Sequence, residues 1–114
     1  MSLQYSNISG ASIQTLIPLR EVKSATTNLT TVTFDSNIMS SISLCNRHAS
    51  DAVVVDLYIS DIGGDDTYYI LKNNSIAFGA RLLLEKKEIS FSNKILQLKI
   101  KLNASDSLLD VIIR

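Results

Sequence analysis

Hydrophobic and polar residues alternate one by one along much of this chain, which is the pattern of β-strands with one buried face. The clearest case is residues 53–60, where Val53, Val55, Leu57 and Ile59 alternate with more polar positions. β-Branched residues and threonines are frequent in such segments, and no window shows a convincing helical stripe. The pattern predicts an all-β protein, with further strands at Val32–Phe34, Ile38–Cys45, Leu96–Leu102 and Leu109–Ile113.

Short polar segments separate the predicted strands. Residues 61–66 contain two glycines between strand-like runs, so we predict a hairpin loop there. Residues 46–51 predict a second hairpin, between the strands on either side of it. We expect further turns at residues 72–75, 85–88 and 103–107. Strands at a spacing of about ten residues predict one antiparallel β-sandwich, immunoglobulin-like or jelly-roll, with a small barrel as the alternative.

The length and the two ends of the chain predict its domain organisation. A chain of 114 residues fits one ordinary domain, and we predict a single β-sandwich domain over residues 13–114. Residues 1–12 are polar and weakly patterned, so they predict an N-terminal arm, either unordered or ordered only against a neighbouring subunit. Residues 13–19 fit an edge strand because Pro18 lacks an amide donor. The apolar segment Val111–Ile113 predicts a last strand inside a sheet, without which the fold should fail.

Charge and cysteine content narrow the classes of partner. Lys plus Arg and Asp plus Glu each number 11, so the formal net charge is zero and the chain offers little attraction to nucleic acid. The N-terminus lacks a signal-peptide pattern, and no apolar run is long enough to span a membrane. The single cysteine, Cys45, excludes an intramolecular disulfide. We expect a protein that folds in a reducing cytoplasm, with no nucleic-acid partner and no membrane partner.

Few residues are candidates for chemistry. Cys45 and His48 are close in the chain, but a Cys–His nucleophile usually needs a third orienting group, and a cysteine at a strand end commonly acts as a small hydrophobe. A single histidine does not make a histidine-based metal cluster. Asp61, Asp65 and Asp66 resemble a calcium site in composition but lack the EF-hand spacing, and a solvated hairpin tip explains the same residues. We expect no catalytic residue, no cofactor and no metal.

Aromatic and apolar residues indicate where a partner could bind. Tyrosine offers apolar area with a polar tip, so the three tyrosines between residues 58 and 69 predict a sugar-stacking or protein-contact patch. Core or cross-strand packing is the other interpretation of these tyrosines. The predicted edge strand near the N-terminus offers unpaired main-chain groups to another chain. The candidate partner-contact residues are Ile13, Leu16, Ile17, Tyr58, Tyr68 and Tyr69.

The segment Ser40–Ile59 combines a strand that ends in Cys-Asn, a small Ala/Ser turn and an alternating strand. Together with Tyr68–Lys72 and Leu82–Leu84, it resembles small β-sandwich virion structural proteins of tailed bacteriophages, notably marine and cyanobacterial ones. The resemblance covers residues 38–114 and brings no catalytic residues with it. It implies a multi-copy protein of the virion, at the neck, tail, baseplate or capsid surface. Its implied partners are copies of itself and other virion proteins.

Three hypotheses about function remain open at this point. The first is a non-catalytic virion structural protein that acts by protein–protein assembly. The second is a carbohydrate- or receptor-binding module that uses the tyrosines and the acidic loop at residues 61–66. The third is an enzyme that depends on Cys45 or His48, although the chain has no glycine-rich phosphate loop, Gly-x-Ser-x-Gly or Cys-x-x-Cys motif.

Overall fold

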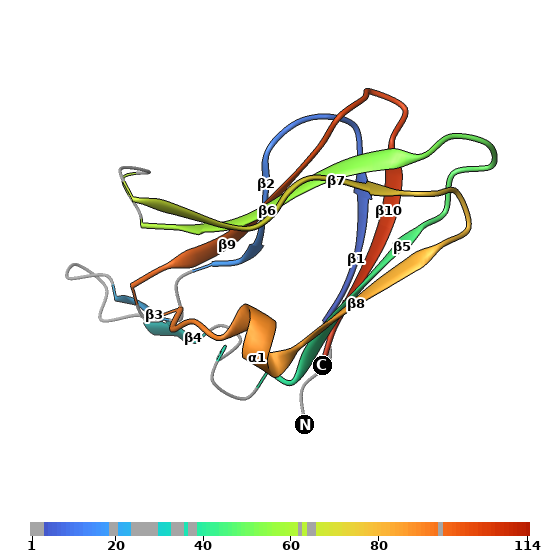
Figure 1. Cartoon of the computed structure of the whole chain (residues 1–114). Coiled ribbons are helices and arrows are strands. Elements are labelled where there is room, and N and C mark those ends of the chain that lie inside the picture. The colour runs from blue at the N-terminus through green and yellow to red at the C-terminus, as the bar shows by residue number, and fades with distance from the viewer. Residues whose placement is uncertain are drawn as a thin grey trace.

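The computed structural model shows a protein built almost wholly of β-strands (Figure 1). It describes residues 4–18, 21–23, 30–32, 36, 39–61, 63, 66–93 and 95–114. The predicted all-β class is confirmed. In chain order the elements are β1 (Gln4–Ser9), β2 (Gln14–Ile17), β3 (Glu21–Lys23), β4 (Thr30–Val32), β5 (Ser41–Asn46), β6 (Val53–Ser60), β7 (Thr67–Ile76), β8 (Arg81–Glu85), α1 (Lys86–Ile89), β9 (Gln97–Leu102) and β10 (Leu108–Ile113).

Eight of the described strands form two antiparallel sheets that enclose the core (Figure 1). The first sheet has the order β1-β10-β5-β8, and the second has the order β2-β9-β6-β7. The pairs are nested, because β1 pairs with β10, β2 with β9, β5 with β8 and β6 with β7. Such a chain is one long hairpin rolled into a sandwich, which is a jelly roll. The predicted sandwich is confirmed. Its form is not immunoglobulin-like, because the first two strands of an immunoglobulin domain share a sheet, whereas β1 and β2 lie in different sheets.

The core lies between the two sheets and follows the alternation of the sequence. In β10 every second residue is buried, and the residues between them face outward. Fully burying one aliphatic side chain of this kind stabilises a fold by about 1.5–3 kcal/mol relative to leaving it exposed. The buried hydrophobic side chains are Ile8, Leu16, Ile17, Met39, Ile42, Leu44, Val53, Val55, Leu57, Ile76, Leu84, Ile89, Leu98, Ile100, Leu102, Leu109, Val111 and Ile113.

The two predicted hairpins had different outcomes. β6 and β7 form the hairpin predicted at residues 61–66, where the Asp61 amide donates to the carbonyl oxygen of Asp66 (3.1 Å). The hairpin predicted at residues 46–51 was wrong, because β5 belongs to the first sheet and β6 to the second. Residues 103–107 likewise connect β9 and β10, which lie in different sheets. Hairpins and crossings between sheets both use short polar segments, so the sequence does not distinguish them.

Two other predicted turns belong to regular structure. Residues 72–75 lie within the ten-residue strand β7, so the turn predicted there was wrong. Asn73 has a φ of 52°, and the pairing of β7 with β6 shifts register between Val55 and Leu57. Asparagine adopts this left-handed conformation more readily than most residues, so a turn-forming residue here serves a β-bulge. The charged segment at residues 85–88 forms the end of β8 and most of the one-turn helix α1.

The segment predicted as a polar arm, residues 1–12, contains strand β1. This strand pairs with β10 along its whole length, from Gln4 to Ser9, and Ile8 lies in the core. The arm prediction is therefore corrected, since the described residues before position 12 belong to the sandwich. An edge strand with one face toward solvent needs few apolar residues, which is why its sequence is weakly patterned.

The predictions for the edge strand and the last strand are confirmed. β2 ends the second sheet and is followed by Pro18, whereas Leu19 lies outside the described residues. β10 lies inside the first sheet, between β1 and β5. Part of the predicted strand Val32–Phe34 falls in β4, which pairs with β3, and its last two residues lie outside the described part. Among the described residues, no helix has the length and hydrophobicity that crossing a bilayer requires.

Candidate functional site

Four side chains gather on the outer face of the second sheet, and we call them the tyrosine cluster: Asp56 and Tyr58 of β6, and Tyr69 and Lys72 of β7. The two tyrosine rings have centroids 5.2 Å apart and are tilted by 44°. The Lys72 Nζ lies 4.5 Å from the centroid of the Tyr69 ring and 3.5 Å from Oδ2 of Asp56. The ammonium group is therefore attracted by an aromatic face and by a carboxylate together.

Strand alternation and the bulge in β7 bring the tyrosine cluster together. Asp56 and Tyr58 occupy outward positions of β6, next to the buried Val55 and Leu57. At the bulge, the backbone amide of Asn73 donates to Oδ1 of Asp56 (2.8 Å). The carboxylate is thus held by a main-chain amide on one oxygen and by the lysine of the cluster on the other. A regular strand would not turn this amide toward the side chain of its neighbour.

The surroundings of Tyr58 favour its neutral phenol. Burial raises the pKa of Tyr58 above its ordinary value of 10.0, and the nearby Tyr69 and Asp56 raise the pKa further. A neutral phenol both donates and accepts hydrogen bonds. Lys99 and Lys101 of β9 are the register partners of Tyr58 and Asp56. One open face therefore combines two aromatic rings, a carboxylate and several lysines.

A hollow of about 460 Å³ adjoins the tyrosine cluster at Asp56 and Asn73. Its lining is mostly polar and includes Lys101 and Asn103. Aromatic rings beside convergent polar groups suit a ligand with one apolar face and several hydroxyl groups, because the face stacks while the hydroxyls form hydrogen bonds. A sugar ring has this chemistry.

Tyr68 does not belong to the tyrosine cluster. Its register partner is Ile59, which packs against the core, whereas Tyr69 is opposite Tyr58. Successive residues of a strand point to opposite sides, so the predicted patch of three tyrosines is divided between the two faces of β7. Both β7 tyrosines are well exposed, at 57% for Tyr68 and 49% for Tyr69. Of the acidic loop predicted beside them, Asp65 lies outside the described residues.

The three candidate contact residues near the N-terminus have different surroundings. Ile13 is 56% exposed in the connection between β1 and β2. Leu16 and Ile17 are buried in the core, so the prediction that they contact a partner was wrong. The pairing of β2 with β9 shifts register between Thr15 and Ile17, which explains how two consecutive residues both face inward.

His48 lies beside two carboxylates in the connection between β5 and β6. Its Nδ1 accepts hydrogen bonds from the backbone amides of Ser50 (3.1 Å) and Asp51 (3.0 Å). Its Nε2 lies 3.4 Å from Oδ2 of Asp106 and 3.9 Å from Oδ2 of Asp51. Because Nδ1 is an acceptor, Nε2 carries the proton of the neutral ring. The hydrogen bonds of Nδ1 give the ring a structural role in this connection, whereas metal coordination needs a free lone pair on Nε2.

Cys45 is half-buried on the outer side of β5, between Asp110 of β10 and Arg81 of β8. The hydrogen bonds of the His48 ring go to the connection itself and not to this strand. No hydrogen bond among the described residues joins Cys45 to His48. The geometry therefore lacks the nucleophile–base contact on which a Cys–His mechanism depends.

No protein-family model and no curated protein matches this chain. Among solved structures, the chain is similar to a chain in the structure of infectious bursal disease virus, Gx strain. The sequence identity is 17% and the TM-score is 0.35. The alignment covers 99% of this chain and 33% of the viral chain, so this chain spans about a third of the length of that protein.

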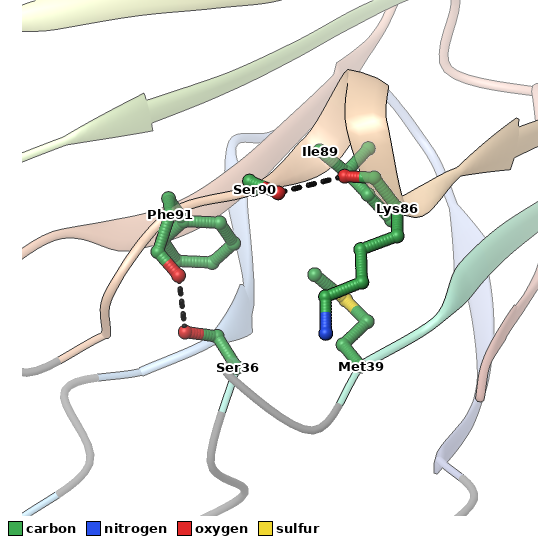
Figure 2. A pocket seen from close by; sticks show the side chains of 6 residues that line it. All are labelled: Ser36, Met39, Lys86, Ile89, Ser90 and Phe91. Atoms are coloured by element: carbon green, nitrogen blue, oxygen red, sulfur yellow. Dashed lines mark hydrogen bonds between the residues drawn. The ribbon is translucent and has the colours of Figure 1, made fainter.

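A second hollow, of about 370 Å³, lies beside α1 (Figure 2). Its apolar lining comes from the buried Met39 and Ile89 and the half-buried Phe91. Ser36 donates from Oγ to the carbonyl oxygen of Phe91 (2.7 Å) and from its amide to Oδ1 of Asn93 (3.0 Å). These bonds join residues 55 and 57 positions apart, a contact that the sequence pattern does not indicate. The polar groups are used to connect the chain to itself, so we assign this hollow a structural role.

Two members of the tyrosine cluster were missed by the sequence analysis. Asp56 shares the alternation of Tyr58, so the pattern of β6 was sufficient to place both on one face. Lys72 was not predictable in the same way, because the bulge at Asn73 changes the register of β7 against β6. Because a turn was predicted at residues 72–75, Lys72 was not recognised as part of a strand.

Proposed function

We propose that this protein is a non-catalytic structural protein of a virus particle and that it acts by protein–protein assembly. The observation that carries the proposal is the nested pairing of its eight sandwich strands. This jelly-roll wrapping recurs in viral capsid domains and in lectins. The finer proposal, a component of a tailed-phage neck, tail, baseplate or capsid surface, is supported by the resemblance of residues 38–114 to such proteins.

The jelly roll suits an assembly role for a physical reason. Its core is completed within one chain, so both outer sheet faces and the edge strands remain open to neighbours. Several large apolar side chains are exposed on the strands and on the connections between them: Tyr5, Ile13, Tyr68, Tyr69, Phe78, Leu83 and Ile95. Exposed apolar area of this kind contributes to association when a partner covers it. The proposed partners are copies of this chain and other virion proteins, and the proposed location is the virion, after folding in the host cytoplasm.

Purified particles provide the direct test of this proposal. An antiserum against the purified chain should detect it in gradient-purified phage particles and label them at one defined position in electron micrographs. A second antiserum against a major capsid protein is the control for particle recovery. Intact particles that contain the capsid protein but none of this chain would contradict the proposal.

A second candidate function is a carbohydrate- or receptor-binding module, which the tyrosine cluster and its adjoining hollow favour. Tyr69→Ala should abolish saturable glycan binding, because it removes the exposed ring that packs at a tilt against Tyr58 and lies under the Lys72 ammonium. Tyr68→Ala is the matched control, since Tyr68 is the next residue of the same strand and is exposed to a similar degree. A broad glycan array without a single saturable ligand would exclude the carbohydrate form of this candidate.

A further inference from the structure

The outer face of the first sheet carries a row of three apolar residues and one serine across its four strands. The residues paired with one another at this level are Tyr5 of β1, Ile112 of β10, Ser43 of β5 and Leu83 of β8. Tyr5 is 69% exposed and Leu83 is 51% exposed. Single exposed apolar residues are ordinary, whereas several of them aligned across a sheet mark a contact surface. We call these four residues the apolar row.

Charged residues flank the apolar row on both sides, two positions away along the strands. On β8, Arg81 precedes the row and Glu85 follows it. On β10, Asp110 precedes the row, and Arg114 follows it directly after the end of the strand. The Arg114 amide donates to the carbonyl oxygen of Ser41 (3.0 Å). Both strands are antiparallel to β5, so they run in the same direction. Along that direction, β8 presents a positive residue, then an apolar one, then a negative one. The segment from Asp110 to Arg114 presents the same three kinds of residue in the reverse order.

This charge pattern is complementary to itself. A two-fold axis along the apolar row places each strand over the same strand of a second copy, running the opposite way. Arg81 then lies over Glu85 of the second copy, and Asp110 lies over Arg114 of the second copy. A two-fold axis parallel to the strands instead places β8 over β1, where Arg81 meets the uncharged Asn7. Only the first arrangement pairs opposite charges at the flanking positions of both β8 and β10.

We propose that two copies of this chain bind each other through the outer face of the first sheet, about the two-fold axis along the apolar row. The proposal deepens the assembly role above, on which its biological meaning rests, by naming the partner and the surface. A hollow of about 130 Å³ lies between Leu83 and Ile112, over the small side chains of Ser41 and Ser43. Arg81 and Arg114 also line this hollow, and in the proposed arrangement it faces the same hollow of the second copy. Packed sheets cross at about −30°, and long Arg and Glu side chains reach their partners across that angle.

Arg81 and Glu85 of β8 test this arrangement more clearly than Asp110 and Arg114 do. Asp110 already accepts a hydrogen bond from Asn7 (2.7 Å) and lies 2.8 Å from the Arg47 Nε. Arg81 and Glu85 are exposed, and none of the ion pairs between described residues includes them. They are four positions apart on one strand, about 13 Å, which is too far for them to pair with each other. Among the described residues, their side chains are therefore available to a neighbouring copy.

The area of the outer face of the first sheet indicates the affinity that we expect for the dimer. Four strands about 4.8 Å apart and about six residues long present about 400 Å² in projection from each copy. Two such faces give about 800 Å², which is below the range of stable specific interfaces, so we expect a weak and rapidly reversible dimer. A weak contact of this kind can still hold two chains together in a multi-copy particle. Other contacts in the particle keep the two chains close, which raises the effective concentration of each chain near the other.

The test is a charge exchange measured by sedimentation equilibrium on the full-length chain at low salt. Arg81→Glu should weaken the dimer by about tenfold or more, because two like-charge contacts replace two attractive ones. Glu85→Arg should weaken it similarly. The double variant R81E/E85R should return to within about threefold of the unmodified chain. An equimolar mixture of the two single variants should form heterodimers, because an acidic β8 face then meets a basic one. Thr15→Glu, at an exposed position on β2 of the other sheet, is the control and should leave the dimer unchanged.

Each outcome decides the proposal. A chain that stays monomeric at about 1 mM overturns it, as does a double variant that stays as weak as the single variants. A monomer whose Leu83→Asp variant is lost from particles shows that this face binds a different virion protein, which also overturns the second-copy proposal. Absence of the unmodified chain from particles contradicts the proposed function but leaves the measured dimer intact. Circular dichroism of each variant checks that the sandwich still folds.

Discussion

The side-chain amide of Asn46, at the end of β5, donates to the carbonyl oxygen of Ile76, at the end of β7, over 2.9 Å. This bond joins the two sheets of the jelly roll, because β5 belongs to the first sheet and β7 to the second. The same Nδ2 donates to the carbonyl oxygen of Asp51 (2.9 Å), and Oδ1 accepts from the amide of His48 (2.9 Å). Asn46 is 0% exposed and has its polar atoms in hydrogen bonds, so it fixes the corner where the chain crosses between sheets.

Asn46→Ala should lower the free energy of unfolding by about 2–4 kcal/mol, because it removes the side-chain partner of the buried Ile76 carbonyl oxygen and of two partly buried main-chain groups. Urea unfolding followed by circular dichroism measures this change. Asn7→Ala is the matched control, since Asn7 is an exposed asparagine with one side-chain bond, to Asp110, and its loss should cost less than about 1 kcal/mol. Equal losses for the two variants would show that the corner does not depend on the buried amide.

Adjacent leucines in β10 allow a direct test of which face packs into the core. Leu109 is 0% exposed, whereas Leu108 is only partly buried. Leu109→Ala should therefore destabilise the protein by about 2–5 kcal/mol, through lost burial and the cavity left behind. Leu108→Ala should cost about 1 kcal/mol or less. Denaturant unfolding of both variants measures the difference. A larger loss for Leu108→Ala would contradict the register of β10.

The left-handed backbone at Asn73 predicts a clear order among substitutions. Asn73→Gly should leave stability within about 0.5 kcal/mol of the unmodified chain, because glycine adopts a positive φ without a steric cost. Asn73→Val should lower the free energy of unfolding by about 1–2 kcal/mol, because a β-branched residue is strained there. Thermal unfolding of the two variants checks the order. Should valine be tolerated as well as glycine, the bulge in β7 is not as described.

The raised pKa of Tyr58 makes stability fall at alkaline pH. The unfolded chain releases this proton near pH 10, whereas the folded protein keeps it to a higher pH because of burial and the nearby Tyr69 and Asp56. Between those two pKa values the folded state binds more protons, so the free energy of unfolding decreases as pH rises above about 10. Tyr58→Phe removes this contribution and should lose less stability over the same range. Urea unfolding at several pH values checks the two slopes, and parallel curves would contradict the assignment.

Much of the strand content followed from alternation in the sequence. The segments around β5, β6, β9 and β10 were predicted because a sheet with one buried face requires an apolar residue at every second position. β1 was missed because it is a polar edge strand that gives the core only Ile8 among its buried residues. The chain through Asn73 was predicted as a turn because asparagine signals positive φ, which bulges and turns both use.

The candidate surfaces were less predictable, for a geometric reason. The tyrosine cluster depends on a bulge, and the apolar row depends on the register of strands that are far apart in the chain. Tyr5 and Ile112 are separated by almost the whole sequence and become neighbours only because β1 pairs with β10. Leu16 and Ile17 were predicted to contact a partner because they are apolar residues of an edge strand. In the structure both are buried in the core.

By itself, the sequence determined that this protein is an antiparallel β-sandwich with a core of alternating aliphatic residues and a last strand inside a sheet. It did so because side-chain burial in a strand has a period of two, which is a local property. Only the tertiary structure decided that the sandwich is a jelly roll, which connections cross between sheets and which outward residues stand side by side. These depend on pairing between distant segments, and short polar connections look alike whether they close a hairpin or join two sheets.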